Sequence, residues 1–254
     1  MSSIKNATDQ PLASEIKEYL KTAPEIYLAG VSVDTVIFGF DNDKLHVLLL
    51  RFSDTPYYTL AGGYIEKEED LDHAALRILS ERTGLKNIYL EQFYTSGKHN
   101  RTNTGITKDA LKKLTGILPP GNWLDQRFIS VCYYALVDET KVEPKIQEPF
   151  TSGFKWFEIN KLPKLLFDHK FIIEKALSRL QADLDTKLIG FNLMNETFTM
   201  NQLQKLYEAV HQMKLVRTNF QRKMLTLGVL ERLEKQYNGK SHKAPYLYRF
   251  ILAK

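Results

Sequence analysis

The residues best able to do chemistry lie in a short segment after the glycine pair Gly62-Gly63. Positions 78, 81 and 82 are spaced i, i+3 and i+4, so on a helix their side chains leave from one face. Carboxylates in that arrangement hold divalent cations, which neutralise a diphosphate and activate a water molecule. In this chain the three residues are Ile78, Glu81 and Arg82, so this face carries a single carboxylate.

The same segment resembles the signature of the Nudix hydrolases, in which fixed spacings separate glycines, glutamates and an arginine. Seven residues fall on the positions of that signature: Gly63, Glu69, Arg77, Leu79, Glu81, Gly84 and Leu85. The resemblance implies a mixed α/β fold in which Glu69 and Arg77 pair to hold the loop against the helix. The family places acidic metal ligands where this chain has Ile78 and Arg82.

These two replacements make the cluster three charge units more positive than the family consensus. A guanidinium about 6 Å from a divalent ion repels it by roughly 5 kcal/mol at an effective dielectric of about 20. We therefore expect no catalytic residues, no cofactor and no well-occupied metal site. Mg²⁺ would enter only if the protein were a hydrolase, with Glu81 as a ligand. It stays equally open that the helix is only a scaffold, with Ile78 and Leu79 in a core.

Composition indicates a globular protein without a membrane span. Its 254 residues include 43% apolar and 26% charged residues, which is ordinary for a folded domain. The single cysteine, Cys132, lies in an apolar run and is expected to be a buried thiol, and the chain can form no internal disulfide. No apolar stretch approaches the roughly 18 residues of a membrane span, and no signal peptide is evident. We expect a cytoplasmic protein.

The pattern along the chain predicts four parts. Residues 1–24 are polar and are interpreted as a mobile arm with a possible short helix, and residues 25–160 as a Nudix-like domain with a mixed sheet flanked by helices. Residues 161–185 contain a linker helix, expected over 168–184, and residues 186–254 form a winged helix-turn-helix. Strands are expected at 26–40, 44–52, 87–94, 127–137 and 153–158. The polar connection over 96–125, with a helix at 108–114, is unusually long.

The last part predicts two helices followed by a hairpin. Thr199 with Gln202 and Thr218 with Gln221 fit two capping boxes. The second helix is expected to bury Phe220, Met224 and Leu227 and to end at Gly228. Strand-like segments at 229–235 and 246–252 flank Asn238-Gly239, a strong hairpin signal.

This segment is also where the positive charge lies. Residues 186–254 hold 12 Lys or Arg and 4 Asp or Glu, a net charge of +8, which leaves −3 for the rest of the chain. The outward face of the second helix and the hairpin tip could contact DNA bases and phosphates. The candidate DNA-binding residues are Arg217, Asn219, Arg222, Lys223, Thr226, Lys240, His242 and Lys243. An ordinary solvated charged face is the competing interpretation.

The two halves together resemble the Nudix-related transcriptional regulators, some of which respond to ADP-ribose-like metabolites and others to a pentose such as arabinose. The resemblance implies a dimer that binds operator DNA and senses a sugar or nucleotide-sugar metabolite without hydrolysing it. Candidate ligand-binding residues are Arg51, Glu81, Arg82 and Arg127.

Two other functions stay open on the sequence. One is a pyrophosphohydrolase acting on ADP-ribose or another nucleoside diphosphate derivative, which needs further carboxylates from Glu66, Glu68, Glu69 or Glu91. The other is a metabolite-binding module that joins a larger complex.

Overall fold

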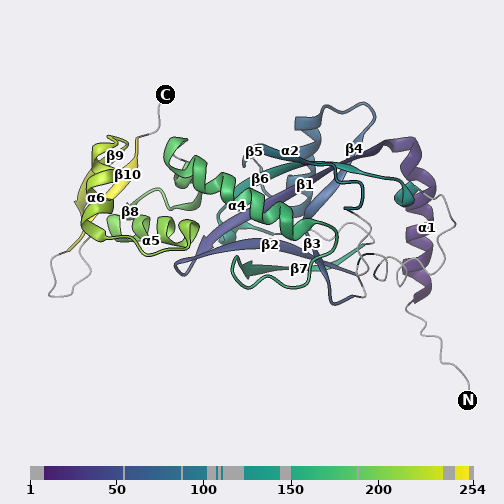
Figure 1. The fold of residues 1–254 in the computed structure, drawn as a ribbon, viewed down its shortest axis with the longest axis horizontal. Helices are drawn as coiled ribbons and strands as arrows, with labels where there is room; N and C mark the ends of the chain where they lie inside the picture. The colour runs from purple at the N-terminus through teal and green to yellow at the C-terminus, as the bar shows by residue number, and fades with distance from the viewer. Residues whose placement is uncertain are drawn as a thin grey trace, which may run out of the picture.

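Helix α4 (His169–Thr186) lies across one face of a mixed sheet and runs toward a small C-terminal unit, and the chain forms an elongated body (Figure 1). The structure is a computed structural model that describes residues 9–53, 55–86, 88–101, 107, 110, 123–143, 150–187, 189–236 and 244–251. Within these residues no helix is both long and apolar enough to cross a membrane.

Within the described residues the sheet has seven strands, and its long central strand β1 pairs antiparallel with β2 and β4 and parallel with β6. The strands are β1 (Tyr27–Asp41), β2 (Lys44–Phe52), β3 (Tyr58–Thr59), β4 (Ala61–Glu66), β5 (Tyr89–Ser96), β6 (Ile129–Val137) and β7 (Thr151–Glu158). The five predicted strands are all present, and the predicted mixed α/β fold is confirmed.

The apolar runs in these strands exist because both faces of the sheet are covered. Along β6, Cys132 and Tyr134 face α4, whereas Tyr133 and Ala135 face helix α2 (Leu71–Thr83). A strand buried on both sides needs apolar residues at every position, not only at alternate ones.

Helix α2 carries the residues of the Nudix-like signature. It ends at Gly84, whose backbone has φ 73° and whose N–H donates to the Ser80 carbonyl. A Cβ at Gly84 would lie 2.9 Å from the Glu143 carbonyl oxygen, so this position requires glycine for both conformation and space.

The predicted mobile arm is wrong from residue 9 onward, because Asp9–Ile26 form helix α1. Ile16 and Ala23 are buried, and the Tyr19 ring packs edge-on against Phe150 at 5.6 Å. These apolar residues are spaced three, four and seven apart and lie on one face of the helix. The polar residues between them make this spacing hard to recognise in the sequence. Residues 1–8 lie outside the described part of the chain.

The predicted linker helix is confirmed as α4, and its buried face belongs to two packing partners. Ile172, Ile173 and Ala176 pack under the sheet, whereas Leu180 and Leu184 share a hydrophobic cluster with the C-terminal unit. One continuous core therefore joins the sheet, α4 and the C-terminal unit.

The C-terminal unit has the predicted order of helix, turn, helix and hairpin. Its elements are β8 (Phe198–Thr199), α5 (Met200–His211), α6 (Arg217–Thr226), β9 (Leu230–Lys235) and β10 (Tyr246–Phe250). The three strands pair antiparallel in the order β8-β10-β9. The hairpin tip, residues 237–243, lies outside the described residues, and so does most of the predicted helix at 108–114.

One capping prediction is confirmed and the other is wrong. Thr199 accepts the Gln202 N–H at 3.2 Å, and Gln202 accepts the Thr199 N–H at 2.8 Å, so α5 has its capping box. Helix α6 begins at Arg217 with Val216 at its N-cap and no side-chain cap. Glu208 of α5 accepts the Leu215 N–H at 3.0 Å and thereby fixes the turn before α6.

The predicted inner face of α6 is largely correct. Phe220 and Met224 are buried, and Gly228 follows the helix with φ 66°. Leu227, predicted to enter the core, is 42% exposed because it lies beyond the last helical turn.

Candidate functional site

An open pocket with a volume of about 160 Å³ lies beside β1, β4 and the start of α4. The polar residues that line it include Ser32, Asp34, Thr59, Arg82, Arg101, Thr151 and His169. A concave site with an apolar wall and a few convergent polar groups is the usual form of a ligand pocket.

The Nudix-like loop is held against α2 by the predicted pair. Arg77 donates from Nε to Glu69 Oε1 at 2.8 Å and from a terminal nitrogen to Glu69 Oε2 at 2.7 Å. These bonds lower the pKa of Glu69. Arg77 also donates to the Tyr64 carbonyl at 2.9 Å, so one guanidinium ties the loop, β4 and α2 together.

The two residues that replace acidic ligands are both buried. Ile78 packs so closely against Gly63 that a Cβ there would lie 2.9 Å from Ile78 Cγ1. Arg82 is 3% exposed and donates to the Gly62 carbonyl at 3.0 Å. Glu81 is paired with Arg77 at 3.3 Å.

The residues present do not fit a catalytic magnesium site. One paired carboxylate beside a buried guanidinium lacks the anionic oxygen ligands that Mg²⁺ requires. In the described part of the chain, no three His, Cys, Asp or Glu side chains are grouped so that they could hold a metal ion.

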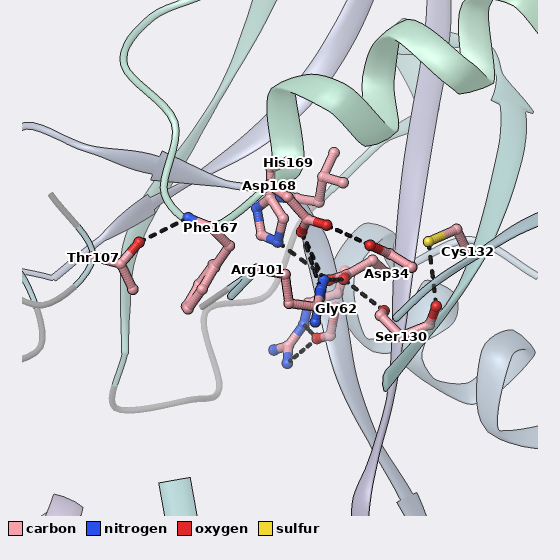
Figure 2. A network of polar contacts seen from close by, with 12 residues as sticks. Asp34, Gly62, Arg101, Thr107, Ser130, Cys132, Phe167, Asp168 and His169 are labelled. Atoms are coloured by element: carbon pink, nitrogen blue, oxygen red, sulfur yellow. Dashed lines mark hydrogen bonds and ion pairs between the residues drawn. The ribbon is translucent and has the colours of Figure 1, made fainter. Parts of the chain in front are cut away.

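A buried charge cluster, consisting of Asp34, Arg101, Asp168 and His169, lies beside the pocket (Figure 2). One terminal nitrogen of Arg101 lies 2.9 Å from Asp34 Oδ2 and 3.0 Å from Asp168 Oδ1. Ser130 donates to Asp34 Oδ2 at 2.6 Å. The cluster therefore links β1, β6 and the start of α4 through charge-assisted hydrogen bonds.

The cluster keeps Asp34 ionised. Burial alone would raise the pKa of Asp34, but the facing His169, the Arg101 guanidinium and the Ser130 hydroxyl outweigh it and hold that pKa far below its usual range. His169 Nδ1 accepts the Leu60 N–H at 2.9 Å, so the ring turns Nε2 toward Asp34 Oδ1, 3.5 Å away. The pocket thus presents a buried carboxylate.

Aromatic side chains form the apolar wall of the pocket. Phe52, Tyr64, Phe128, Phe150 and Phe167 line it. Phe52 and Phe150 are stacked at 6.3 Å, and the Tyr64 ring lies 5.3 Å from Phe128. Flat apolar faces next to a carboxylate suit a ring that carries hydroxyl groups.

The outer face of α6 is exposed over its whole length. Arg217, Asn219, Arg222, Lys223 and Thr226 are all exposed, as predicted. Lys223 lies 5.7 Å from the centre of the Tyr207 ring. Arg217 and Arg222 form no ion pair with another described residue, whereas Lys205 of α5 pairs with Asp43. Lys240, His242 and Lys243 lie outside the described residues.

Two family models match the chain. A NUDIX domain matches residues 29–180, and the NrtR DNA-binding winged helix domain matches residues 190–250. The "ADPR responsive transcriptional repressor NtrR" of Acinetobacter baylyi is 30% identical over 87% of this chain and 82% of its own length. This chain belongs to the Nudix-related transcriptional regulators.

Solved structures share the architecture of this regulator. Shewanella oneidensis NrtR, crystallised with a 27mer DNA, is 27% identical with a TM-score of 0.64, covering 87% of this chain and 93% of that one. A MutT/nudix family protein from Enterococcus faecalis is 19% identical with a TM-score of 0.63, covering 99% of this chain and 100% of that one, and it supports the fold alone.

Of the predicted ligand-binding residues, only Arg82 lines the pocket of this regulator. Glu81 is paired with Arg77 outside the pocket lining. Arg51 is exposed, and its Nε lies 3.4 Å from the Thr55 carbonyl oxygen. Arg127 is exposed and donates to the Gly97 carbonyl. The charge of Arg51 and Arg127 suggested a ligand contact, but charge alone does not indicate where a side chain points.

Three of the four carboxylates that a hydrolase would have to recruit are close to arginines. Glu69 and Glu66 lie near Arg77, at 2.7 and 3.7 Å. Glu91 lies 3.3 Å from Arg179 of α4, and α4 covers the face of the sheet opposite to α2. Glu68 is exposed.

The sequence prediction missed Asp34, Arg101 and His169. Asp34 carried a visible signal, since it is the only charged residue between Val31 and Phe40 in a strand that is otherwise apolar or small and polar. A charge within a strand buried on both faces has to be paired or functional. Arg101 gave no such signal, because it lies in the long polar connection.

Proposed function

We propose that this regulator binds operator DNA as a homodimer in the cytoplasm and changes its DNA affinity when a sugar or nucleotide-sugar occupies the pocket. The observation that carries the proposal is Arg82, which lies inside the pocket on the Gly62 carbonyl where a hydrolase would carry a metal-binding carboxylate. The pocket is thereby preserved as a cavity without the groups for metal-dependent hydrolysis.

The chemistry of the pocket supports a hydroxyl-rich effector. Asp34 supplies an ionised carboxylate that accepts hydrogen bonds, and the aromatic wall offers faces for a sugar ring or a base. The relative's name gives ADP-ribose as the effector of that protein. ADP-ribose and arabinose are therefore the two probes that separate a nucleotide-sugar from a free sugar.

The DNA-binding half of the proposal rests on α6. Its exposed arginines are free of carboxylate partners in the described part of the chain and can reach phosphates or base edges in a major groove. A dimer would present two such helices to half-sites about one helical turn, roughly 34 Å, apart.

The test selects double-stranded DNA from a random library with the full-length protein and measures affinity by fluorescence anisotropy. We expect a specific, salt-sensitive complex whose Kd changes at least about tenfold with ADP-ribose or arabinose. Absence of any specific complex would refute the proposal.

Replacing Arg222 by Ala is expected to weaken the complex about tenfold and to reduce the slope of log K against log salt by about one, because one cation is lost from the interface. Lys205→Ala is the matched control. It removes the same charge from α5, but its ammonium faces Asp43 of the sheet domain. Equal losses in both variants would show that α6 has no special role.

A further inference from the structure

The start of α4 is part of the pocket. Phe167 and His169 both line the cavity, and Asp168 between them is the N-cap of the helix. Phe167 has φ 54°, a left-handed conformation that favours glycine. Its N–H donates to Thr107 Oγ1 at 2.9 Å (Figure 2). External contacts therefore hold this strained turn in place.

The Asp168 side chain does not cap its own helix. An aspartate at an N-cap ordinarily accepts backbone N–H groups of the first turn, but the Asp168 side chain makes no such bond. Its carboxylate instead accepts from Arg101 Nε at 3.1 Å and from the Ser96 hydroxyl. The start of α4 is thus held by Arg101 and by Ser96 of β5.

Arg101 bridges the pocket wall and the helix. The same terminal nitrogen contacts Asp34 of β1 and Asp168 of α4, and both Arg101 and Asp34 line the cavity. A ligand oxygen that reaches Arg101, or a ligand hydroxyl that donates to Asp34, competes with one of these two contacts. An occupant that forms either contact would therefore weaken the bond that holds the helix start.

The other end of α4 contacts the DNA-binding unit. Gln181 donates to the Val210 carbonyl of α5 at 2.9 Å, and Tyr207 of α5 donates to the Leu184 carbonyl at 3.4 Å. The Tyr207 ring in turn packs edge-on against Phe220 of α6 at 5.1 Å. An 18-residue helix spans about 27 Å as one rigid element, so movement at its start is transmitted to its end.

Near its C-terminal end, α4 is also hydrogen-bonded to the sheet. Tyr134 of β6 donates to Asp183 at 2.8 Å, and Arg179 donates to the same carboxylate at 2.6 Å. This contact lies two residues from Gln181 and one residue from Leu184. The last turn of α4 therefore joins the sheet to the DNA-binding unit.

We infer that Arg101 is the positioning residue through which the occupant of the pocket sets the orientation of α4 and hence of the recognition helix α6. The inference rests on the proposed function, since it concerns how the effector site acts on DNA binding. It also gives a role to the long connection over 96–125, which contributes both Arg101 and Thr107 to the start of α4.

The test compares full-length wild type with Asp168→Asn, Arg101→Lys and Arg127→Gln on the DNA selected by the wild type. Asp168→Asn removes the charge on α4 but keeps the Arg101–Asp34 pair, and Arg101→Lys keeps the charge but cannot bridge two carboxylates equally well. Arg127→Gln is the control, because Arg127 is exposed and bonds only to the Gly97 carbonyl among the described residues. Each Kd is measured with and without ADP-ribose or arabinose.

In wild type and Arg127→Gln we expect the effector to change the Kd for DNA about tenfold. In Asp168→Asn the change should fall below about twofold, and Arg101→Lys should lie between, while all four proteins bind DNA in the absence of effector. Hydrogen exchange should also show faster exchange in residues 169–175 of the first two variants. Undiminished effector response in Asp168→Asn and Arg101→Lys would overturn the inference and leave the proposed function intact. If the wild type binds no DNA, or if neither ADP-ribose nor arabinose changes its Kd for DNA, both the proposed function and the inference are refuted.

Discussion

Helices α2 and α4 pack on opposite faces of one sheet and both reach the same pocket, but they differ in the charged side chains that they contribute to it. On α2 the two ligand positions of the Nudix signature are filled by Ile78, which packs into the core, and Arg82, which closes onto the Gly62 carbonyl. At the start of α4, Asp168 and His169 join Asp34 and Arg101 in a buried charge cluster. Most of the charged residues that line the pocket therefore belong to the cluster at the start of α4, and Arg82 alone comes from α2.

This difference shows how the pocket can exist without diphosphate hydrolase activity. A pocket requires a cavity and a few fixed polar groups, whereas hydrolysis of a diphosphate requires several carboxylates around cations. A chain that lacks these carboxylates can therefore still form the pocket.

The largest expected effect is on the α4 side. Asp34→Ala leaves Arg101 buried with one carboxylate fewer, and we expect the free energy of unfolding to fall by about 3–5 kcal/mol. Glu81→Ala on α2 is the comparison. Its pair with Arg77 is partly exposed, so a loss under about 1 kcal/mol is expected. Urea unfolding measures both, and equal losses would remove the distinction between the two sides.

The next effect concerns the α2 side. Arg82→Glu restores an acidic residue of the signature, but it takes the donor from the Gly62 carbonyl and buries a carboxylate beside it. We expect a loss of stability of about 2 kcal/mol and no hydrolysis of ADP-ribose with Mg²⁺. Arg82→Gln, which keeps an N–H donor, should lose less stability. Metal-dependent hydrolysis of ADP-ribose by Arg82→Glu would contradict the conclusion that α2 lacks a working metal site.

A smaller effect is the dependence of stability on pH. Because the pKa of Asp34 is depressed in the folded state, its contribution is present above the unfolded value of 3.8 and is lost as the pH falls below it. Between about pH 4 and pH 3, the unfolding free energy of wild type should fall more steeply than that of Asp34→Asn, by up to about 1.4 kcal/mol per pH unit. Parallel curves would contradict a paired, ionised Asp34.

The elements of the fold could be predicted because their signals are local. The apolar runs of β1 and β6 and the closing Gly84 of α2 are visible within a few residues. Helix α1 was predicted only as a possible short helix in a mobile arm, because the polar composition of the segment obscures the apolar spacing of Ile16, Tyr19 and Ala23. The cap of α6 was misplaced because Glu208, on another helix, sets its first turn.

The pocket could be predicted only in part, because its groups come from distant positions. Arg101 is 67 residues from Asp34 and 67 residues from Asp168, so no local pattern links them. Arg82 was identified because the signature fixes its place on α2. Arg51 and Arg127 were proposed from charge alone, and the fold directs both away from the cavity.

The most direct test of a metal-free sensing pocket is calorimetric titration of the full-length protein with ADP-ribose and with arabinose, once in EDTA and once in Mg²⁺. The account predicts that the effector binds with the same Kd in both conditions and is recovered unchanged. Binding that requires Mg²⁺, or cleavage of the effector during the titration, would contradict it.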